Sequence, residues 1–188
     1  MEKQFLYMVM LGCTPKGRLT EQHDIFFGIG SSLKELVPQM NAFWPEVKGK
    51  IHIDAWRKIS TVEGYKITIE PKSSNAKKEE QLFFLNLGGY NPGEFEEYHY
   101  KIVTVAPSKA VAIKKSKQTL FFKHCGFKGA ESHIDDKFCI DIDDMHIIQD
   151  VLPAVVKASY QIHIEKALEP IEEDELHIGY VKIKTLTI

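Results

Sequence analysis

The chain has 188 residues, of which 44% are hydrophobic and 27% charged, and its formal net charge is −2. This composition is typical of a soluble globular protein with one large domain or two small ones, and it excludes a disordered or fibrous chain. The near-neutral charge argues against nucleic-acid binding, because proteins that neutralise phosphates usually carry a basic excess. Arg18 and Arg57 are the only arginines, which argues in the same direction.

Membrane insertion and export are not expected either. The chain has no apolar run near the ~20 residues that a membrane-spanning helix needs, and the apolar stretch within residues 1–11 is too short for a signal peptide. Three cysteines, Cys13, Cys125 and Cys139, are an odd number without metal-finger spacing, which favours free thiols in a reducing environment. We therefore expect a cytoplasmic protein that does not bind membranes.

The first repeat, residues 1–70, is predicted to form a β-β-α-β-β unit. A helix is expected at about 32–40, because Ser32 and Glu35 have the spacing of a capping box, and Pro38 should end or kink that helix. Apolar or alternating runs predict the strands. They are expected at 5–11, at 24–30, near 52–54 and at 65–70.

The second repeat, residues 82–166, is predicted to follow a polar connector at 71–81. With a shift of seventy-six positions, six of eighteen residues in the first strand and loop are identical, against roughly one expected from average residue usage. The identical pairs are Leu6 and Leu82, Leu11 and Leu87, Gly12 and Gly88, Gly17 and Gly93, Glu21 and Glu97, and His23 and His99. Strands are expected at 82–87, 100–106 and 160–165, with a helix from Pro107 to about Phe122.

Beyond this helix the alignment of the two copies drifts. The HID sequence at 52–54 is matched by HID at 133–135, so the second copy should carry an insertion near 140–159. An acidic connector and a final strand are expected at 167–188. The predicted fold class is α+β, an internal duplication with pseudo-twofold symmetry and mostly antiparallel sheets, in which the repeats can also pack as one compact domain.

The acidic run DIDDMH at 141–146, inside this insertion, is expected to be a solvated loop. A calcium loop of the EF-hand type needs Gly at its sixth position and Glu at its twelfth. Counted from Asp141, those positions hold His146 and Leu152. The run therefore does not predict a calcium site of that type.

A resemblance to a bacterial family, domain of unknown function 1543, is carried by the strings TEQHDIFFGIG, HIDAWRKI, LGGYNPGEFEEYHYK and FKGAESHIDDKF. The resemblance covers most of residues 5–152. It implies a bacterial origin and two tandem copies of the domain in one chain. It implies no activity, substrate or cofactor, because none is assigned to the family.

Two Glu-x-His segments are the strongest candidates for chemistry. Glu21 and His23, like Glu97 and His99, are two residues apart, so both side chains of an extended pair project from one face. A carboxylate beside an imidazole can orient a general base or supply half of a metal site. If the pseudo-twofold axis brings the two segments together, they can form a site for a divalent transition metal.

Other polar candidates come from the two HID strings. They are His52 with Asp54 and His133 with Asp135. A structural role is the alternative to a chemical one for all of these residues. Glu and His next to a glycine-bounded loop commonly hydrogen-bond to its exposed backbone groups. Retention in both copies fits either role.

Two functions remain open from the sequence. The sequence favours the first, a non-enzymatic module that binds a small ligand or a protein partner. The other is a metal-dependent enzyme that acts on a small metabolite, with the duplicated Glu-x-His segments at the interface between the repeats. The sequence identifies neither a substrate nor an oligomeric state.

Overall fold

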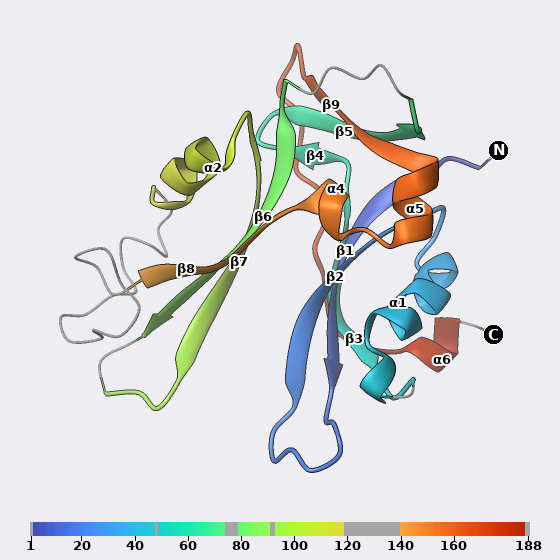
Figure 1. The fold of residues 1–188 in the computed structure, drawn as a ribbon, viewed down its shortest axis with the longest axis vertical. Coiled ribbons are helices and arrows are strands. Elements are labelled where there is room, and N and C mark those ends of the chain that lie inside the picture. Colours follow the sequence, from blue (N-terminus) through green and yellow to red (C-terminus); the bar gives the residue numbers. More distant parts are fainter. Residues whose placement is uncertain (1, 48, 74–78, 91–92, 119–139, 187–188) are drawn as a thin grey trace. The chain divides into compact units, whose positions relative to one another are not determined.

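The structure is a computed structural model, and it describes residues 2–47, 49–73, 79–90, 93–118 and 140–186 (Figure 1). The fold is α+β with mostly antiparallel strands. By internal contacts the chain divides into two compact units. Unit 1 consists of Met1–Asn75 and Val151–Ile188, and unit 2 of Ala76–Asp150.

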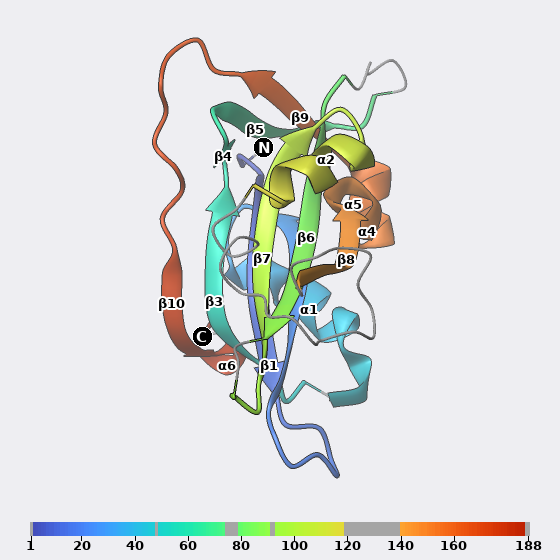
Figure 2. The same cartoon turned by 90° about the vertical axis from the view of Figure 1, so that its left-hand side faces the viewer.

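Unit 1 contains a four-stranded antiparallel sheet in the order β10-β3-β1-β2. Its strands are β1 (Phe5–Cys13), β2 (Gln22–Gly30), β3 (His52–Ile59) and β10 (His177–Lys182). The first two strands form the hairpin that the sequence predicts at 5–11 and 24–30, and the predicted C-terminal strand is β10. In Figure 2, β10 and β3 run side by side, although they are far apart in the sequence.

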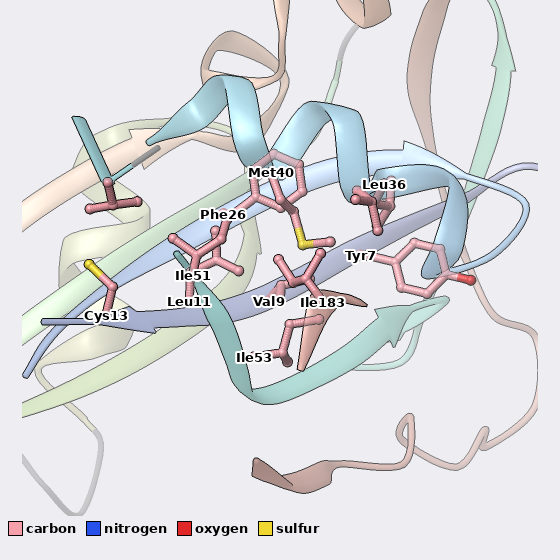
Figure 3. Packing of buried hydrophobic residues seen from close by; sticks show 12 residues of the cluster. Tyr7, Val9, Leu11, Cys13, Phe26, Leu36, Met40, Ile51, Ile53 and Ile183 are labelled. Carbon is pink, nitrogen blue, oxygen red and sulfur yellow. The ribbon is translucent and has the colours of Figure 1, made fainter. Parts of the chain in front are cut away.

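One face of this sheet carries the main core of unit 1. Alternate residues of β1, namely Tyr7, Val9, Leu11 and Cys13, point into a cluster with residues of β2, β3 and the helical segment after β2 (Figure 3). Each fully buried aliphatic side chain of this kind contributes roughly 1.5–3 kcal/mol to folding. Because side chains alternate along a strand, Gly12 lies on the opposite face.

The helical segment between β2 and β3 consists of η1 (Lys34–Leu36), α1 (Val37–Phe43) and η2 (Pro45–Val47). Pro38 lies in the first turn of α1, where a proline is tolerated because the first N–H groups have no partner within the helix. The expected helix is thus interrupted next to Pro38, with η1 ending at Leu36, but the proline begins a new helix instead of ending one. Glu35 accepts a hydrogen bond from the Ser31 N–H at 2.7 Å, one residue before the predicted cap at Ser32.

A second, three-stranded sheet of unit 1 has the order β4-β5-β9. Its strands are β4 (Thr61–Val62), β5 (Tyr65–Pro71) and β9 (Tyr160–Lys166). The short helices α4 (Ile148–Val151) and α5 (Ala154–Ser159) precede β9, and α6 (Ile183–Leu186) follows β10. The matched runs YKITIE and YQIHIE are thus neighbours in one sheet, paired from Tyr65 with Lys166 to Pro71 with Tyr160.

Unit 2 contains a three-stranded antiparallel sheet in the order β7-β6-β8 and the helix α2 (Lys109–Ser116). Its strands are β6 (Gln81–Tyr90), β7 (Glu97–Ala106) and β8 (Ile140–Ile147). Phe83, Leu85, Ala106 and Ala112 form its buried cluster. The Ser108 hydroxyl caps α2 by accepting a hydrogen bond from the Val111 N–H, in line with the predicted helix start.

Two details of unit 2 differ from the sequence predictions. Helix α2 ends at Ser116 instead of continuing to about Phe122, and the residues from 119 to 139 lie outside the described part of the chain. The acidic run at 141–146, expected as a solvated loop, lies in strand β8 and pairs with β6. Ile140 and Ile142 alternate with acidic residues, which is the two-residue period of a β-strand. The prediction of a loop was based on the number of charges and overlooked this period.

The predicted repeats are defined by sequence similarity, and their boundaries differ from those of the two compact units. Strand β9, expected in the second repeat, belongs to unit 1 and pairs with β5. The division into 1–70, 71–81, 82–166 and 167–188 stays a prediction about how the chain arose. None of the described helices is long and apolar enough to cross a membrane.

Candidate metal centre in unit 1

Four polar side chains of unit 1 converge on the face of the sheet opposite the main core. They are Glu21 just before β2, His23 in β2, and His52 and Asp54 in β3. The His52 Nε2 lies 3.0 Å from Glu21 Oε1 and 3.3 Å from Asp54 Oδ2. The His23 Nε2 lies 3.3 Å from the same Asp54 oxygen and 3.6 Å from Glu21 Oε2.

Gly12 of β1 makes room for this cluster, because it lies opposite His23 on one side and His52 on the other. A Cβ atom at this position would lie 2.3 Å from Asp54 Oδ2 and 2.6 Å from His52 Nε2. Any other residue would therefore occupy the space in which the polar atoms meet. Gly12 has the backbone conformation of an ordinary strand. The glycine is therefore required because it has no side chain, and not because it adopts an unusual backbone angle.

A β-bulge brings Asp54 into the cluster. Met10 pairs with Ala55 and Leu11 with Ile53, so Asp54 is the extra residue of β3 that has no partner in β1. The insertion also explains why Ile53 and Trp56, which are three residues apart, both contact the main core. Bulges commonly redirect side chains next to functional sites.

The two halves of the cluster differ in exposure. The side chains of His52 and Asp54 are 11% and 21% exposed, whereas those of Glu21 and His23 are 44% and 42% exposed. The β3 half is thus fixed by its surroundings, and the ring of Tyr180 from β10 packs against that of His52 at 4.6 Å between centroids. The Glu21 and His23 half faces water and is free to adjust.

The buried atoms of the cluster lack hydrogen bonds. His52 Nε2 and Asp54 Oδ2 are both inaccessible to solvent and have no hydrogen-bond partner, although they take part in three of the four close contacts. The oxygens near His52 therefore lie at contact distance but off the direction in which its ring nitrogen donates or accepts. A buried polar atom left in this state costs roughly 1–3 kcal/mol.

Cys13 lies at the end of β1 beside this region but on the core side. Burial, with a further contribution from the negative charge of Glu21, raises the pKa of its thiol. The thiol is therefore kept neutral, and a metal ligand or a nucleophile would need the thiolate. Among the described residues, no group of three or more His, Cys, Asp and Glu side chains is arranged, as it stands, so that it could hold a metal ion.

The other predicted site residues are distributed between the second unit and the rest of the chain. Glu97 and His99 begin β7 of unit 2, so each Glu-x-His segment lies in a different compact unit. His133 and Asp135 lie outside the described residues. The predicted meeting of the two Glu-x-His segments at a pseudo-twofold axis stays a prediction.

All four residues of the cluster are candidates predicted from the sequence, but the sequence does not indicate that they form one group. Glu21 and His23 were expected to find their partners in the second repeat, whereas His52 and Asp54 of the same unit lie beside them. The missed signal is Gly12, a glycine inside a strand, which marks a place where other groups approach the backbone closely. Tyr180 was also missed, because nothing in the tail sequence ties it to His52.

The comparisons agree with this description of the fold. The family described as Domain of Unknown Function (DUF1543) matches residues 18–69, a stretch that includes all four residues of the cluster, so the resemblance to this family is supported there. The crystal structure of a protein Il1583 from Idiomarina loihiensis is 21% identical and has a TM-score of 0.61. That alignment covers 96% of this chain and 98% of the other. No curated protein matches the chain.

Proposed function

We propose that the protein is a metal-binding module and that unit 1 holds a divalent transition metal ion through Glu21, His23, His52 and Asp54. The observation that carries this proposal is the pair of buried atoms His52 Nε2 and Asp54 Oδ2, which lie only 3.3 Å apart and have no hydrogen-bond partner. A cation between them would satisfy both at once. A purely structural clamp would instead be expected to use them in hydrogen bonds.

The spacing of the donor atoms supports the proposal. Bonds of about 2.0–2.2 Å to a tetrahedral ion place neighbouring donors roughly 3.3–3.6 Å apart, and an octahedral ion brings them to about 3.0 Å. The four contacts of the cluster span 3.0 to 3.6 Å. Glu21 and His23 are the exposed half of the cluster, so their side chains can reorient around an ion more easily than those of His52 and Asp54.

The charges of the cluster point to the same class of ligand. As metal ligands, two carboxylates and two imidazoles together carry a charge of −2, which a divalent cation neutralises. Imidazole nitrogen suits zinc, iron, nickel and copper, whereas carboxylate oxygen is shared with manganese and magnesium. A mixed set of two nitrogens and two oxygens therefore favours a transition metal over magnesium or calcium.

The test is metal analysis of untagged protein after dialysis against zinc and removal of free metal. We expect His52→Ala and His23→Ala each to lose the zinc bound by unit 1. His163→Ala is the matched control, because His163 is a similarly exposed histidine beside a carboxylate, Glu70. His23 is 42% exposed, so its replacement tests metal binding without removing core volume. Equal zinc in all four proteins would show that the cluster is a clamp.

We propose an internal duplication as the origin of the two Glu-x-His segments. The six identities at a constant shift support it, and so does the common strand order in which β1 and β6 each lie between two antiparallel neighbours. The cluster in unit 1 takes its carboxylates and imidazoles from one repeat. Metal binding there does not require Glu97 or His99.

A metal-dependent enzyme acting on a small metabolite is the second candidate function. The exposure of Glu21 and His23 favours it, because catalytic metal sites keep a position open to water or substrate, whereas structural sites are closed. Cobalt-loaded protein tests this candidate. A change of the cobalt absorption spectrum on adding azide would show an open coordination position, and an unchanged spectrum would leave the closed, non-enzymatic module.

A further inference from the structure

The sheet face that carries the unit 1 cluster continues along β1 as an apolar row. Two residues before Gly12, Met10 lies between Ile25 of β2 and Ala55 of β3. These three residues share the face of Gly12, because side chains alternate along a strand. All three are only partly buried. The cluster is therefore bordered by apolar side chains that still have surface to offer to a ligand.

Arg57 of β3 lies beyond this row. It pairs with Met8 of β1, two residues before Met10, and so it lies on the same face as the cluster. At the rise of a β-strand, the four residues from Gly12 to Met8 separate the two ends by about 13 Å along the sheet. The next row of this face is fully buried and consists of Leu6, Ile29 and Ile59.

The Arg57 side chain is partly buried and has no counter-charge. Among the described residues, its guanidinium takes part in no ion pair and no hydrogen bond. The chain otherwise carries its positive charge on lysine, since only two of its 24 Lys and Arg residues are arginines. Arginine differs from lysine in its planar group of donors, which binds a carboxylate through two parallel hydrogen bonds. Arg57 is thus suited to an anion that does not belong to the protein.

We propose that unit 1 binds an elongated small molecule with a carboxylate at one end, which pairs with Arg57, and a metal-binding group at the other. This inference rests on the proposed function, because the metal holds the second end of the ligand. The row of Met10, Ile25 and Ala55 contacts the apolar middle of the molecule, and the unbranched side chain of Met10 adapts to its shape. A single guanidinium matches the single charge of a carboxylate. Arg57 therefore determines which class of ligand is bound.

The experiment is calorimetric titration of the zinc-loaded full chain with unbranched dicarboxylates from butanedioate to octanedioate. One carboxylate of such a probe binds the metal and the other reaches Arg57. We expect one of these probes to bind about tenfold or more tightly than the monocarboxylate of the same length, because hydrogen bonds between charged groups contribute a factor of roughly this size. The same probe should change the absorption spectrum of the cobalt-loaded protein, which reports that it reaches the metal.

Arg57→Met keeps the apolar part of the side chain and removes the charge. This variant should bind zinc as the wild type does, but it should bind the dicarboxylate no more tightly than the monocarboxylate. Lys58→Met is the matched control. Lys58 is the next residue of β3 and also a cation, but it lies on the opposite face, where its Nζ is 4.5 Å from the centroid of the Phe5 ring. This control should keep the preference for the dicarboxylate.

The outcomes separate this inference from the proposed function. Zinc binding without a preference for any dicarboxylate, or an equal preference in Arg57→Met and the wild type, would overturn the inference and leave the metal site standing. Tighter binding of 6-phosphonohexanoate than of heptanedioate would overturn the assignment of a carboxylate. A wild-type chain that binds no zinc would overturn both the proposed function and the inference.

Discussion

At the scale of single residues, the candidate centre depends on one position without a side chain as much as on its four polar residues. Gly12 lies between two strands whose histidines extend over it. The sequence revealed the donors through their spacing, since Glu21 and His23 share a face of an extended segment. It could not reveal the volume above Gly12, because that volume is created by pairing with β3, whose His52 lies opposite Gly12 but 40 residues further along the chain (52 − 12).

Gly12→Ala should abolish metal binding in unit 1 although no ligand is changed. The added methyl group would lie 2.3 Å from Asp54 Oδ2, so the side chains must separate, and overpacking of this kind costs roughly 1–3 kcal/mol. Zinc content and urea unfolding are the measurements. Gly17→Asn is the control, because Gly17 has φ +85° with open space around it and asparagine tolerates that conformation. Full zinc binding by Gly12→Ala would contradict the proposed site.

The free energy of unfolding should fall at alkaline pH, because two buried groups then lose their protons. Burial raises the pKa of Tyr7 and of Cys13 above their ordinary values of 10.0 and 9.0, with smaller contributions from the charges of Glu35 and Glu21. The folded state holds these protons more tightly than the unfolded state. Their contribution is therefore complete below the ordinary values and is lost as the pH rises past them.

Urea unfolding at a series of pH values, from neutral pH to above the ordinary pKa of tyrosine, measures this loss. Tyr7→Phe should show a smaller decrease in the free energy of unfolding than the wild type, because one of the two raised pKa values is removed. A wild-type free energy that stays constant over this range would show that neither proton is held differently in the two states.

At the scale of elements, the strands of the hairpins were predictable and the connections between sheets were not. Apolar runs identify β1, β2, β6 and β7, because each is buried along much of its length. Strand β8 was not predicted, because its acidic residues are typical of a solvent-exposed loop. The pairing of β9 with β5 is a contact between distant segments that no local pattern specifies.

The segment before β10 is held by Asp174. Its carboxylate accepts hydrogen bonds from the N–H groups of Ser60 and Thr61, at 2.7 and 2.9 Å, and from the Ser60 hydroxyl. These bonds fix the turn between β3 and β4 and hold the segment that leads to the edge strand. Asp174 thus adds a side-chain attachment between the C-terminal and N-terminal parts of unit 1 to those made by the strand pairs β5–β9 and β3–β10.

Asp174→Ala should therefore destabilise the protein by about 1–3 kcal/mol, because two backbone N–H groups and a hydroxyl lose their acceptor. Urea unfolding measures the loss, and amide hydrogen exchange should show faster opening of β10 than of β1. Glu173→Ala, at an exposed neighbouring residue, is the control and should be close to neutral. Equal stability of the two variants would show that the segment is held elsewhere.

At the scale of the whole molecule, unit 1 is discontinuous in sequence. Its two parts, Met1–Asn75 and Val151–Ile188, are separated by the whole of unit 2. The repeat visible in the sequence suggested two successive units, because local similarity says nothing about where a C-terminal strand docks. Both the second sheet and the edge of the first sheet of unit 1 require segments from beyond residue 150.

A chain of residues 1–73 should fail to fold cooperatively. It lacks β9, which pairs with the whole of β5, and β10, which completes the larger sheet. Residues 1–73 joined by a flexible Gly-Ser linker to 151–186 should regain a cooperative thermal transition, measured by circular dichroism. Cooperative unfolding of 1–73 alone would show that β9 and β10 are dispensable.

The discontinuity of unit 1 also sets an order of events during synthesis. Domains generally fold as units as they leave the ribosome, the N-terminal one first. Here the segment Ala76–Asp150 is complete while part of unit 1 has not yet been translated. The unit formed by the middle segment of the chain is therefore the first that can finish folding. Until Tyr180 and the rest of β10 emerge, His52 lies in an open edge strand, so the proposed metal site of unit 1 should become complete only after these residues have emerged.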